Sequence, residues 1–391
     1  MKKDRWKQRI TIYSFLTCIV SMTMLIVISP REQISKAERR RLATRPQLTV
    51  ENILDESFME DTENYLLDHF PFREGLRRMK AQYACNILRQ KENNGIYIAG
   101  GTASKLEYPL NEASVVRMAD KLVSLKHQYF PNENTWYAVI PDKNFFLAEP
   151  NGYPSMDYDR MLELFTQKLD NSGERFDYID IAAGLEVDDY YRTDSHWRQE
   201  QLLGTVTIVG EAMGINESLN LQESNFERHE IKDFYGVYYG QSALPMEPDT
   251  IVYLTNETTD EASVWNLEEN LSKDGQVTMP EHVGAVWNPV YQIQKLEEPL
   301  CLDQYDVFLG GAASLQIIKS PKANTDRRLV IFRDSFTSSL APLLLEAYSE
   351  ITLIDLRYIS TPLVGEYVNF EGADIVFLYN TSIINNASML K

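Results

Sequence analysis

The sequence predicts an α/β fold: a doubly wound, mostly parallel sheet with an N-terminal transmembrane helix, a helical neck and a β-containing insertion. Short apolar runs alternate with helical patterns from about residue 113 onward, as expected for a parallel sheet covered on both faces. An uncharged run, residues 10–29, lies near the N-terminus. Of the 391 residues, 44% are hydrophobic and 24% charged, which provides material for a core and excludes wholesale disorder.

The uncharged run 10–29 follows a basic tail, residues 1–9, which we expect on the cytoplasmic side. At about 1.5 Å per helical residue the run spans about 30 Å, the thickness of a bilayer core. A cleaved signal peptide is the alternative, but Pro30 stands where cleavage would be expected. Residues 31–45 carry a net charge of +4, the same as the tail, so the orientation is close to a tie. We expect a single-pass cell-membrane protein with an extracellular bulk.

Composition also excludes several classes of partner and cofactor. The formal net charge of −19 argues against a surface that binds nucleic acid. The three cysteines lack metal-ligand spacing, and the sequence does not decide whether Cys85 and Cys301 meet in a disulfide. Asp188 and Asp189 are adjacent acids without further ligands, a pattern that is usually solvated. We expect no metal and no cofactor.

The predicted elements follow in chain order. Residues 30–92 have apolar positions at helical spacings and form the neck, which a turn at 93–95 ends. In the main domain, residues 93–391, residues 96–98 form a short extended piece. Residues 215–300 are acidic and rich in turns, and are predicted as an insertion that contains β-structure. We expect helices at 113–129, 154–170, 197–213 and 337–348, and strands at 136–140, 176–181, 305–309, 329–332, 351–354 and 375–379.

Ser335 lies where an apolar strand ends and a helix is expected to begin. Open α/β folds place their sites at the carboxyl ends of such strands. A helix N-terminus and the adjoining backbone N–H groups can also stabilise an oxyanion. The structural alternative is an ordinary N-cap, which is the more frequent role for a serine at such a junction when nothing else is known.

Asp194 and His196 stand two residues apart, just before another predicted helix. A serine nucleophile needs a base within hydrogen-bond reach, and that base needs a carboxylate to orient it and stabilise its charge. One short Asp-x-His loop supplies both groups. We therefore predict that these residues meet Ser335 as a catalytic triad. The remaining histidines are expected to be structural or exposed: His69, His127, His229 and His282.

The segment Thr193–Trp197 resembles the DHHW-type signature of cell-envelope proteins related to the alginate O-acetylation enzymes, in the SGNH hydrolase-like superfamily with permuted order. Ser195 fills the variable position of that signature. The resemblance runs from about residue 38 to the C-terminus. It implies an SGNH hydrolase-like domain in which Ser335 is the nucleophile, His196 the general base and Asp194 its orienting acid. The other landmarks are residues 38–43, 70–73, 141–143, 234–236, 308–311, 333–336 and 354–358.

The resemblance also points to oxyanion donors. The backbone N–H groups of Gly311 and Ser335 are the candidates. Ala312 stands where relatives often carry a polar residue such as Asn, so an amide donor is missing there. Asn380, at the end of the last predicted strand, could replace that amide or serve as a turn residue.

Substrate-binding candidates each have a structural alternative. Lys143 could bind an acidic polymer or brace a carboxylate within the fold, and the same holds for Arg73 and Arg357. Arg333, which stands where many superfamily members carry Gly, is a further candidate. Tyr235 and Tyr239 could stack on sugar faces or pack the insertion.

Two functions remain open at this point. The first is a membrane-anchored O-acyltransferase or acylesterase, for acetyl groups, acting on a cell-envelope or secreted polysaccharide. The family then implies an integral-membrane acyl exporter as donor partner. The alternative is a non-catalytic glycan-binding or assembly module of the cell envelope with the same fold, which Ala312 favours.

Overall fold

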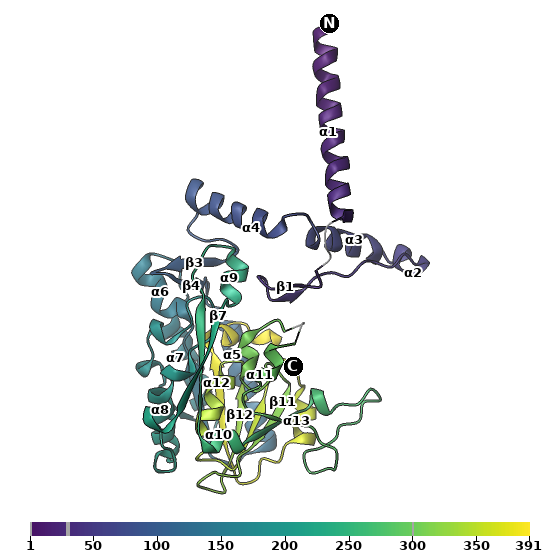
Figure 1. The fold of residues 1–391 in the computed structure, drawn as a ribbon. Coiled ribbons are helices and arrows are strands. Elements are labelled where there is room, and N and C mark those ends of the chain that lie inside the picture. The colour runs from purple at the N-terminus through teal and green to yellow at the C-terminus, as the bar shows by residue number, and fades with distance from the viewer. Residues whose placement is uncertain (1, 29–31, 299–300) are drawn as a thin grey trace. The chain divides into compact units, whose positions relative to one another are not determined.

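The structure is a computed structural model that describes residues 2–28, 32–298 and 301–391 (Figure 1). It divides into two compact units. The first unit comprises Met1–Asn94 with Tyr239–Pro245, and the second comprises Gly95–Tyr238 with Met246–Lys391. Helix α9 (Val237–Ser242) contains the point at which the chain passes from the second unit to the first.

The first unit begins with helix α1 (Lys2–Ile28). Its segment Trp6–Ile26 is 21 residues long and apolar enough to cross a membrane, a test that a signal sequence near the N-terminus also passes. The end of the predicted anchor at Ser29, and Pro30 after it, lie outside the described residues.

The remainder of the first unit is mainly helical. A short antiparallel pair, β1 (Ile34–Ser35) and β2 (Arg40–Arg41), precedes the helices. Glu38 binds Arg73 at 2.6 Å and Arg77 at 3.2 Å, so Arg73 braces a carboxylate within its own unit. The helices are α2 (Val50–Leu54), α3 (Ser57–Asp68) and α4 (Arg73–Gln82), followed by a π-helical turn, Tyr83–Ile87.

The second unit is built on an eight-stranded sheet in the order β10-β9-β11-β13-β12-β14-β5-β6. The run from β13 to β6 is parallel, and the β10-β9-β11 edge is antiparallel. The predicted mostly parallel α/β sheet is therefore confirmed. The strands are β5 (Thr135–Ile140), β6 (Asp177–Tyr178), β9 (Ser263–Asn266), β10 (Trp287–Pro289), β11 (Leu315–Lys319), β12 (Arg328–Arg333), β13 (Glu350–Ile354) and β14 (Ala373–Asn380).

Helices cover both faces of this sheet (Figure 1). Alternate residues of β12 point to opposite sides: Leu329 and Ile331 pack in one core with α8, whereas Val330 and Phe332 pack in the other with α5 and α7. The helices of this unit are α5 (Glu112–Tyr129), α6 (Lys143–Asn151), α7 (Tyr158–Asp170), α8 (Leu203–Met213), α10 (Glu257–Glu261), α11 (Ile293–Leu296), α12 (Thr337–Leu340), α13 (Thr361–Tyr367) and α14 (Thr381–Ile384).

Several predicted elements differ in type or length. The helices expected at 154–170 and 197–213 begin at Tyr158 and Leu203, and the strand expected at 176–181 is the two-residue β6. Two further differences have a visible local cause. The strand expected at 305–309 is a 3₁₀ turn, Gln304–Val307, because the Asp303 side chain caps it by accepting from the Tyr305 N–H at 2.8 Å. The helix expected at 337–348 divides into α12 and a 3₁₀ turn at Ala341–Leu344, since Pro342 has no N–H to continue the α-helical ladder.

The region 215–300, which we predicted as an insertion containing β-structure, is not separate from the main sheet. Strands β9 and β10 lie within it, yet they pair at the edge of the main sheet. A further antiparallel pair, β7 (Glu227–Phe234) and β8 (Asp249–Thr255), packs its apolar side in the same core as α8. A second small pair, β3 (Ile96–Ala99) and β4 (Thr102–Lys105), includes the predicted extended piece.

Candidate active site

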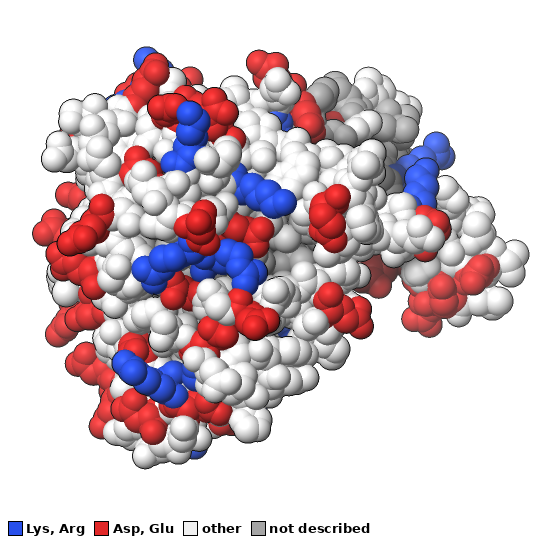
Figure 2. Space-filling view, turned by 90° about the horizontal axis from the view of Figure 1, so that it is seen from below, with Lys and Arg blue, Asp and Glu red and all other residues white. Residues whose placement is uncertain are grey.

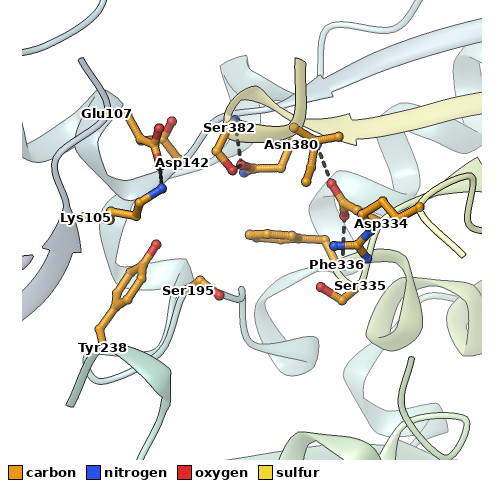
Figure 3. A pocket seen from close by; sticks show the side chains of 12 residues that line it. Lys105, Glu107, Asp142, Ser195, Tyr238, Asp334, Ser335, Phe336, Asn380 and Ser382 are labelled. Atoms are coloured by element: carbon orange, nitrogen blue, oxygen red, sulfur yellow. Dashed lines mark hydrogen bonds and ion pairs between the residues drawn. The ribbon is translucent and has the colours of Figure 1, made fainter. Parts of the chain in front are cut away.

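The turn after β12 is held rigidly by Asp334. This buried carboxylate accepts from the backbone N–H of Phe336 at 3.0 Å and of Asn380 at 2.6 Å. Burial raises the pKa of Asp334. These bonds connect the ends of β12 and β14, and they leave Ser335 between them with its side chain at a pocket (Figure 3).

The loop before α8 holds Asp194 and His196. Asp194 is fully buried, and its Oδ1 accepts from His196 Nδ1–H at 2.6 Å and from the His196 backbone N–H at 3.0 Å. Its Oδ2 accepts from the Val237 N–H at 2.8 Å. A carboxylate at Nδ1 places the proton there and leaves Nε2 free to accept.

The structure brings the two segments together. His196 Nε2 lies 2.7 Å from Ser335 Oγ, although the residues are 139 positions apart in the chain. Ser335, His196 and Asp194 thus form a continuous hydrogen-bonded chain from a partly buried serine to a fully buried carboxylate. This is the geometry by which a base activates a serine for nucleophilic attack.

Neighbouring groups fix the imidazole and its loop. The ring of Tyr305 stacks on His196 with centroids 4.0 Å apart, and the Tyr305 O–H donates to Ser339 Oγ at 2.8 Å. Trp197 Nε1–H donates to the Phe336 carbonyl at 2.9 Å, which connects the histidine loop to the serine turn. These contacts restrict the rotation of the His196 ring relative to Ser335.

A pocket of about 170 Å³ opens in front of Ser335. In Figure 3, Lys105, Glu107 and Asp142 lie across the pocket from Ser335, and Tyr238 lies on the same far side. Burial raises the pKa of Asp142 to about 6. The full lining is Lys105, Glu107, Asp142, Ser195, Tyr238, Asp334, Ser335, Phe336, Arg357, Asn380, Ser382 and Ile383.

Comparisons with known proteins bear on the fold of this chain. No family model and no curated protein matches the chain. Among solved structures, a DHHW family protein from Eubacterium siraeum has a TM-score of 0.55 at 18% identity, covering 76% of this chain and 95% of its own. Bacillus cereus PatB1 has a TM-score of 0.54 at 16% identity, covering 74% and 96%. The predicted relation to DHHW-type proteins is confirmed at the level of the fold. The O-acetyltransferase domain of Pseudomonas putida AlgJ, with a TM-score of 0.40, is too distant to add to this.

Within this DHHW-type fold, some of the candidate oxyanion donors lie at the pocket and one does not. The Gly311 N–H donates to the Phe308 carbonyl at 3.1 Å within a turn, and Gly311 does not line the pocket. Asn380 does line it, with one amide hydrogen donated to the Ile140 carbonyl at 3.1 Å. The third candidate is the N–H of Ser335, the predicted nucleophile, which lies in the turn before α12. Of the candidate donors, Ser335 and Asn380 are therefore the two whose residues line the pocket.

Two predicted substrate-binding cations are buried instead. Arg333 is fully buried, donating to Gln316 Oε1 at 2.6 Å and Ser338 Oγ at 3.0 Å. Lys143 is also buried; its ammonium donates to the Tyr191 carbonyl at 2.9 Å. Burial lowers the pKa of Lys143 to about 7, although Asp194 and Asp249 partly offset this effect. Both side chains support the fold beneath the site, and neither lines the pocket.

Neither of the two predicted substrate-binding tyrosines lines the pocket. Tyr239 belongs to the first unit, where its hydroxyl accepts from Arg78 at 2.8 Å. Tyr235 is 37% exposed and does not line the pocket. Tyr238 lines it instead and was missed, because a run of aromatic residues does not reveal which ring faces inward.

The pocket's basic residues are both neutralised. Lys105, which the sequence did not single out, binds Glu107 at 2.7 Å. Arg357 binds Asp355 at 2.6 Å, the structural role considered for it. The only sequence feature that could have indicated Lys105 as a pocket residue is the pair of opposite charges in Lys105-x-Glu107. Such pairs are common on exposed strands.

Other sequence candidates have no site around them. Cys85 lies in the first unit and Cys301 in the second. Within the described ranges, no three or more His, Cys, Asp or Glu side chains gather as a metal site. Asp189 caps its own 3₁₀ turn by accepting from the Glu186 N–H at 2.7 Å.

Proposed function

We propose that this protein is a serine-dependent O-acyltransferase or acylesterase that transfers or removes acetyl groups on an extracellular polysaccharide while anchored in the membrane by α1. The observation that carries the proposal is the hydrogen-bonded chain from Ser335 through His196 to Asp194, with 2.7 Å and 2.6 Å contacts. A buried, oriented imidazole beside an accessible serine is the arrangement that acyl transfer requires.

The reaction follows from these contacts. Ser335 Oγ attacks the carbonyl carbon of an acyl donor while His196 Nε2 takes the hydroxyl proton. The Ser335 N–H and the Asn380 amide stabilise the resulting oxyanion. The carbon–leaving-group bond then breaks, His196 returns the proton to the leaving group, and an acyl-serine ester remains. A sugar hydroxyl or water attacks this ester, His196 takes its proton, and that proton returns to Ser335 Oγ as the new ester or acid departs.

The pocket supports a small acyl group and a neutral acceptor. A volume of about 170 Å³ is below the usual range of ligand pockets, which suits acetyl better than a long chain. Because Lys105 is paired with Glu107 and Arg357 with Asp355, neither cation is left to balance a uronic acid. A polysaccharide with uncharged hydroxyl-bearing sugars is therefore the favoured acceptor, and an integral-membrane acyl exporter is the proposed donor.

The surface charge is compatible with such a partner. On the face shown in Figure 2, acidic side chains are spread widely and surround smaller groups of basic ones. A surface of this kind gives no electrostatic attraction to an anionic polymer.

The proposal is tested by covalent labelling. Bacillus cereus PatB1 has been seen with a sulfonyl adduct. Sulfonyl fluorides and activated acetyl esters modify activated serines, so each should give a stoichiometric adduct on Ser335 that peptide mass spectrometry localises. His196→Ala should abolish labelling with the folded state intact.

A matched control is His127→Ala. His127 also pairs with a carboxylate, Glu174 at 3.1 Å, but on the exposed surface away from the pocket. This variant should label like the wild type. Absence of any Ser335 adduct, or equal labelling of the His196→Ala variant, would contradict the proposed chemistry.

One observation favours the second candidate, a glycan-binding module without catalysis. The Gly311 N–H is engaged in its own turn, which leaves fewer oxyanion donors than the family pattern implies. Under this alternative the protein binds a neutral oligosaccharide with equal affinity in the wild type and in Ser335→Ala, and neither protein turns over an activated ester.

A further inference from the structure

Helix α4 and the turn after it expose an apolar stripe. We define this stripe by five residues at spacings of four, three, four and four: Phe72 is the N-cap residue that precedes α4, and the other four follow one face of the helix and of the π-helical turn after it. Their exposed fractions are large for apolar side chains in a soluble protein. The stripe consists of Phe72 (79%), Leu76 (40%), Met79 (61%), Tyr83 (55%) and Ile87 (66%).

The opposite face of the same helix packs on the first unit. Ala81 is fully buried and Ala84 is 4% exposed. Arg77 also points inward, donating to the Gly240 carbonyl at 2.7 Å and pairing with Glu38 at 3.2 Å. A surface helix normally buries its apolar face and exposes its polar one. Here the polarity is reversed, so the apolar face is available to something outside the unit.

The charges beside the stripe are positive. Helix α4 contains four basic residues and one acidic residue, in a chain of net charge −19. Arg73 and Arg77 are paired with Glu38, whereas Arg78 and Lys80 donate to neutral groups, the Tyr239 hydroxyl at 2.8 Å and Asn93 Oδ1 at 2.6 Å. In helical projection Lys80 falls about 40° from Leu76, at the edge of the stripe, whereas Arg78 lies about 160° from Leu76, towards the opposite face. Their charges are therefore not neutralised by these partners.

We propose that the apolar stripe of α4 binds the surface of an anionic lipid bilayer. A basic helix with an exposed apolar face lies in the plane of the membrane interface, with its apolar side chains at the boundary between headgroups and acyl chains. Lys80 then faces the lipid phosphates, and Arg78 adds to the positive charge of the same helix. The same unit contains α1, whose segment Trp6–Ile26 is long enough to cross a bilayer, so a membrane is the surface nearest to this unit when α1 is inserted.

The test uses the full chain in vesicles. Cys18, Cys85 and Cys301 are replaced by serine, and Met79→Cys carries an environment-sensitive fluorophore. Reconstitution uses phosphatidylcholine alone or with phosphatidylglycerol, each with a lipid-borne quencher. We expect a blue shift and loss of intensity that are larger with phosphatidylglycerol and decrease in high salt. The same label at Glu60→Cys, an exposed acidic position on α3, should be quenched by aqueous iodide and not by the lipid quencher.

Charge reversal gives an independent arm. The double variant Arg78→Glu and Lys80→Glu should lose the dependence on phosphatidylglycerol, with far-ultraviolet circular dichroism confirming its fold. A label at position 79 that iodide quenches would overturn the proposal. A label shielded from both quenchers would overturn it as well, because a protein surface would then cover the stripe. None of these readouts depends on Ser335 chemistry, so the failure of this proposal and the failure of the proposed function are separable.

Discussion

Gly236 is the position where one added methyl group should damage the site most directly. A Cβ there would lie 2.2 Å from Asp194 Cβ, 2.5 Å from its Cα and 2.6 Å from its backbone N. These atoms belong to the backbone or adjoin it, so rotation of a side chain cannot relieve the contact. The two segments must separate, although they are joined by the bonds from Gly236 N–H to Thr193 Oγ1 at 2.9 Å and from Val237 N–H to Asp194 Oδ2 at 2.8 Å.

The expected magnitude of Gly236→Ala has two parts. Overpacking of this kind lowers the free energy of unfolding by about 1–3 kcal/mol. Displacing Asp194 also removes the group that orients His196, a change that costs up to about 10⁴-fold in rate in serine triads. We therefore expect the rate of Ser335 acylation by an activated acetyl ester to fall by about 10²–10⁴-fold, measured by stopped-flow release of the leaving group together with a thermal melt.

Gly204→Ala is the matched control. Gly204 lies within α8, and nothing is within 4 Å of the position its Cβ would take. Replacing a helical glycine by alanine stabilises by about 0.5–1 kcal/mol, and the acylation rate should not change. If Gly236→Ala acylates as fast as Gly204→Ala, the position of Asp194 does not govern the reaction and the reasoning from geometry is refuted.

Three further changes test the surroundings of the site. Tyr305→Leu removes the ring stacked on His196 and should slow acylation by about 2–10-fold, since such pairs contribute about 0.5–1.5 kcal/mol; an unchanged rate would assign Tyr305 to packing alone. Trp197→Phe removes the Nε1–H donor to the Phe336 carbonyl and should lower stability by about 1–3 kcal/mol in a urea titration, whereas equal midpoints would contradict this. Lys143→Met tests the buried ammonium, whose pKa of about 7 lies below that in the unfolded chain; the folded protein therefore binds fewer protons above pH 7, and stability should rise with pH. The wild type should gain about 2 kcal/mol more than Lys143→Met between pH 7 and 9, and parallel pH curves would rule this out.

The short-range features of this chain were readable from its sequence. Asp194 and His196 lie two residues apart, so a single loop conformation brings their side chains into hydrogen-bond contact. A short sequence motif is therefore enough to predict this contact. The parallel strands β12, β13 and β14 are continuous apolar runs because helices cover both faces of the sheet. Such runs can be recognised in the sequence even when the pairing of the strands is not known.

Features set by distant partners were not readable in the same way. The run 305–309 has the apolar content of a strand, but its ends are held by Asp303 and by the turn that includes Gly311. Arg333 and Lys143 carry charges that normally indicate exposure, yet buried acceptors from other segments receive their hydrogen bonds. Burial is a property of the assembled chain, so residue type alone did not predict it.

The sequence by itself determined the α/β class, the apolar N-terminal helix and the identity of the three side chains proposed for catalysis, because periodicity and local spacing are written in consecutive residues. Only the tertiary structure decided that Ser335 and His196, 139 positions apart, lie within hydrogen-bond distance. It also decided which tyrosine faces the pocket and which face of α4 is left apolar and exposed. These outcomes depend on contacts between segments far apart in the chain, and such contacts form only when the whole chain packs.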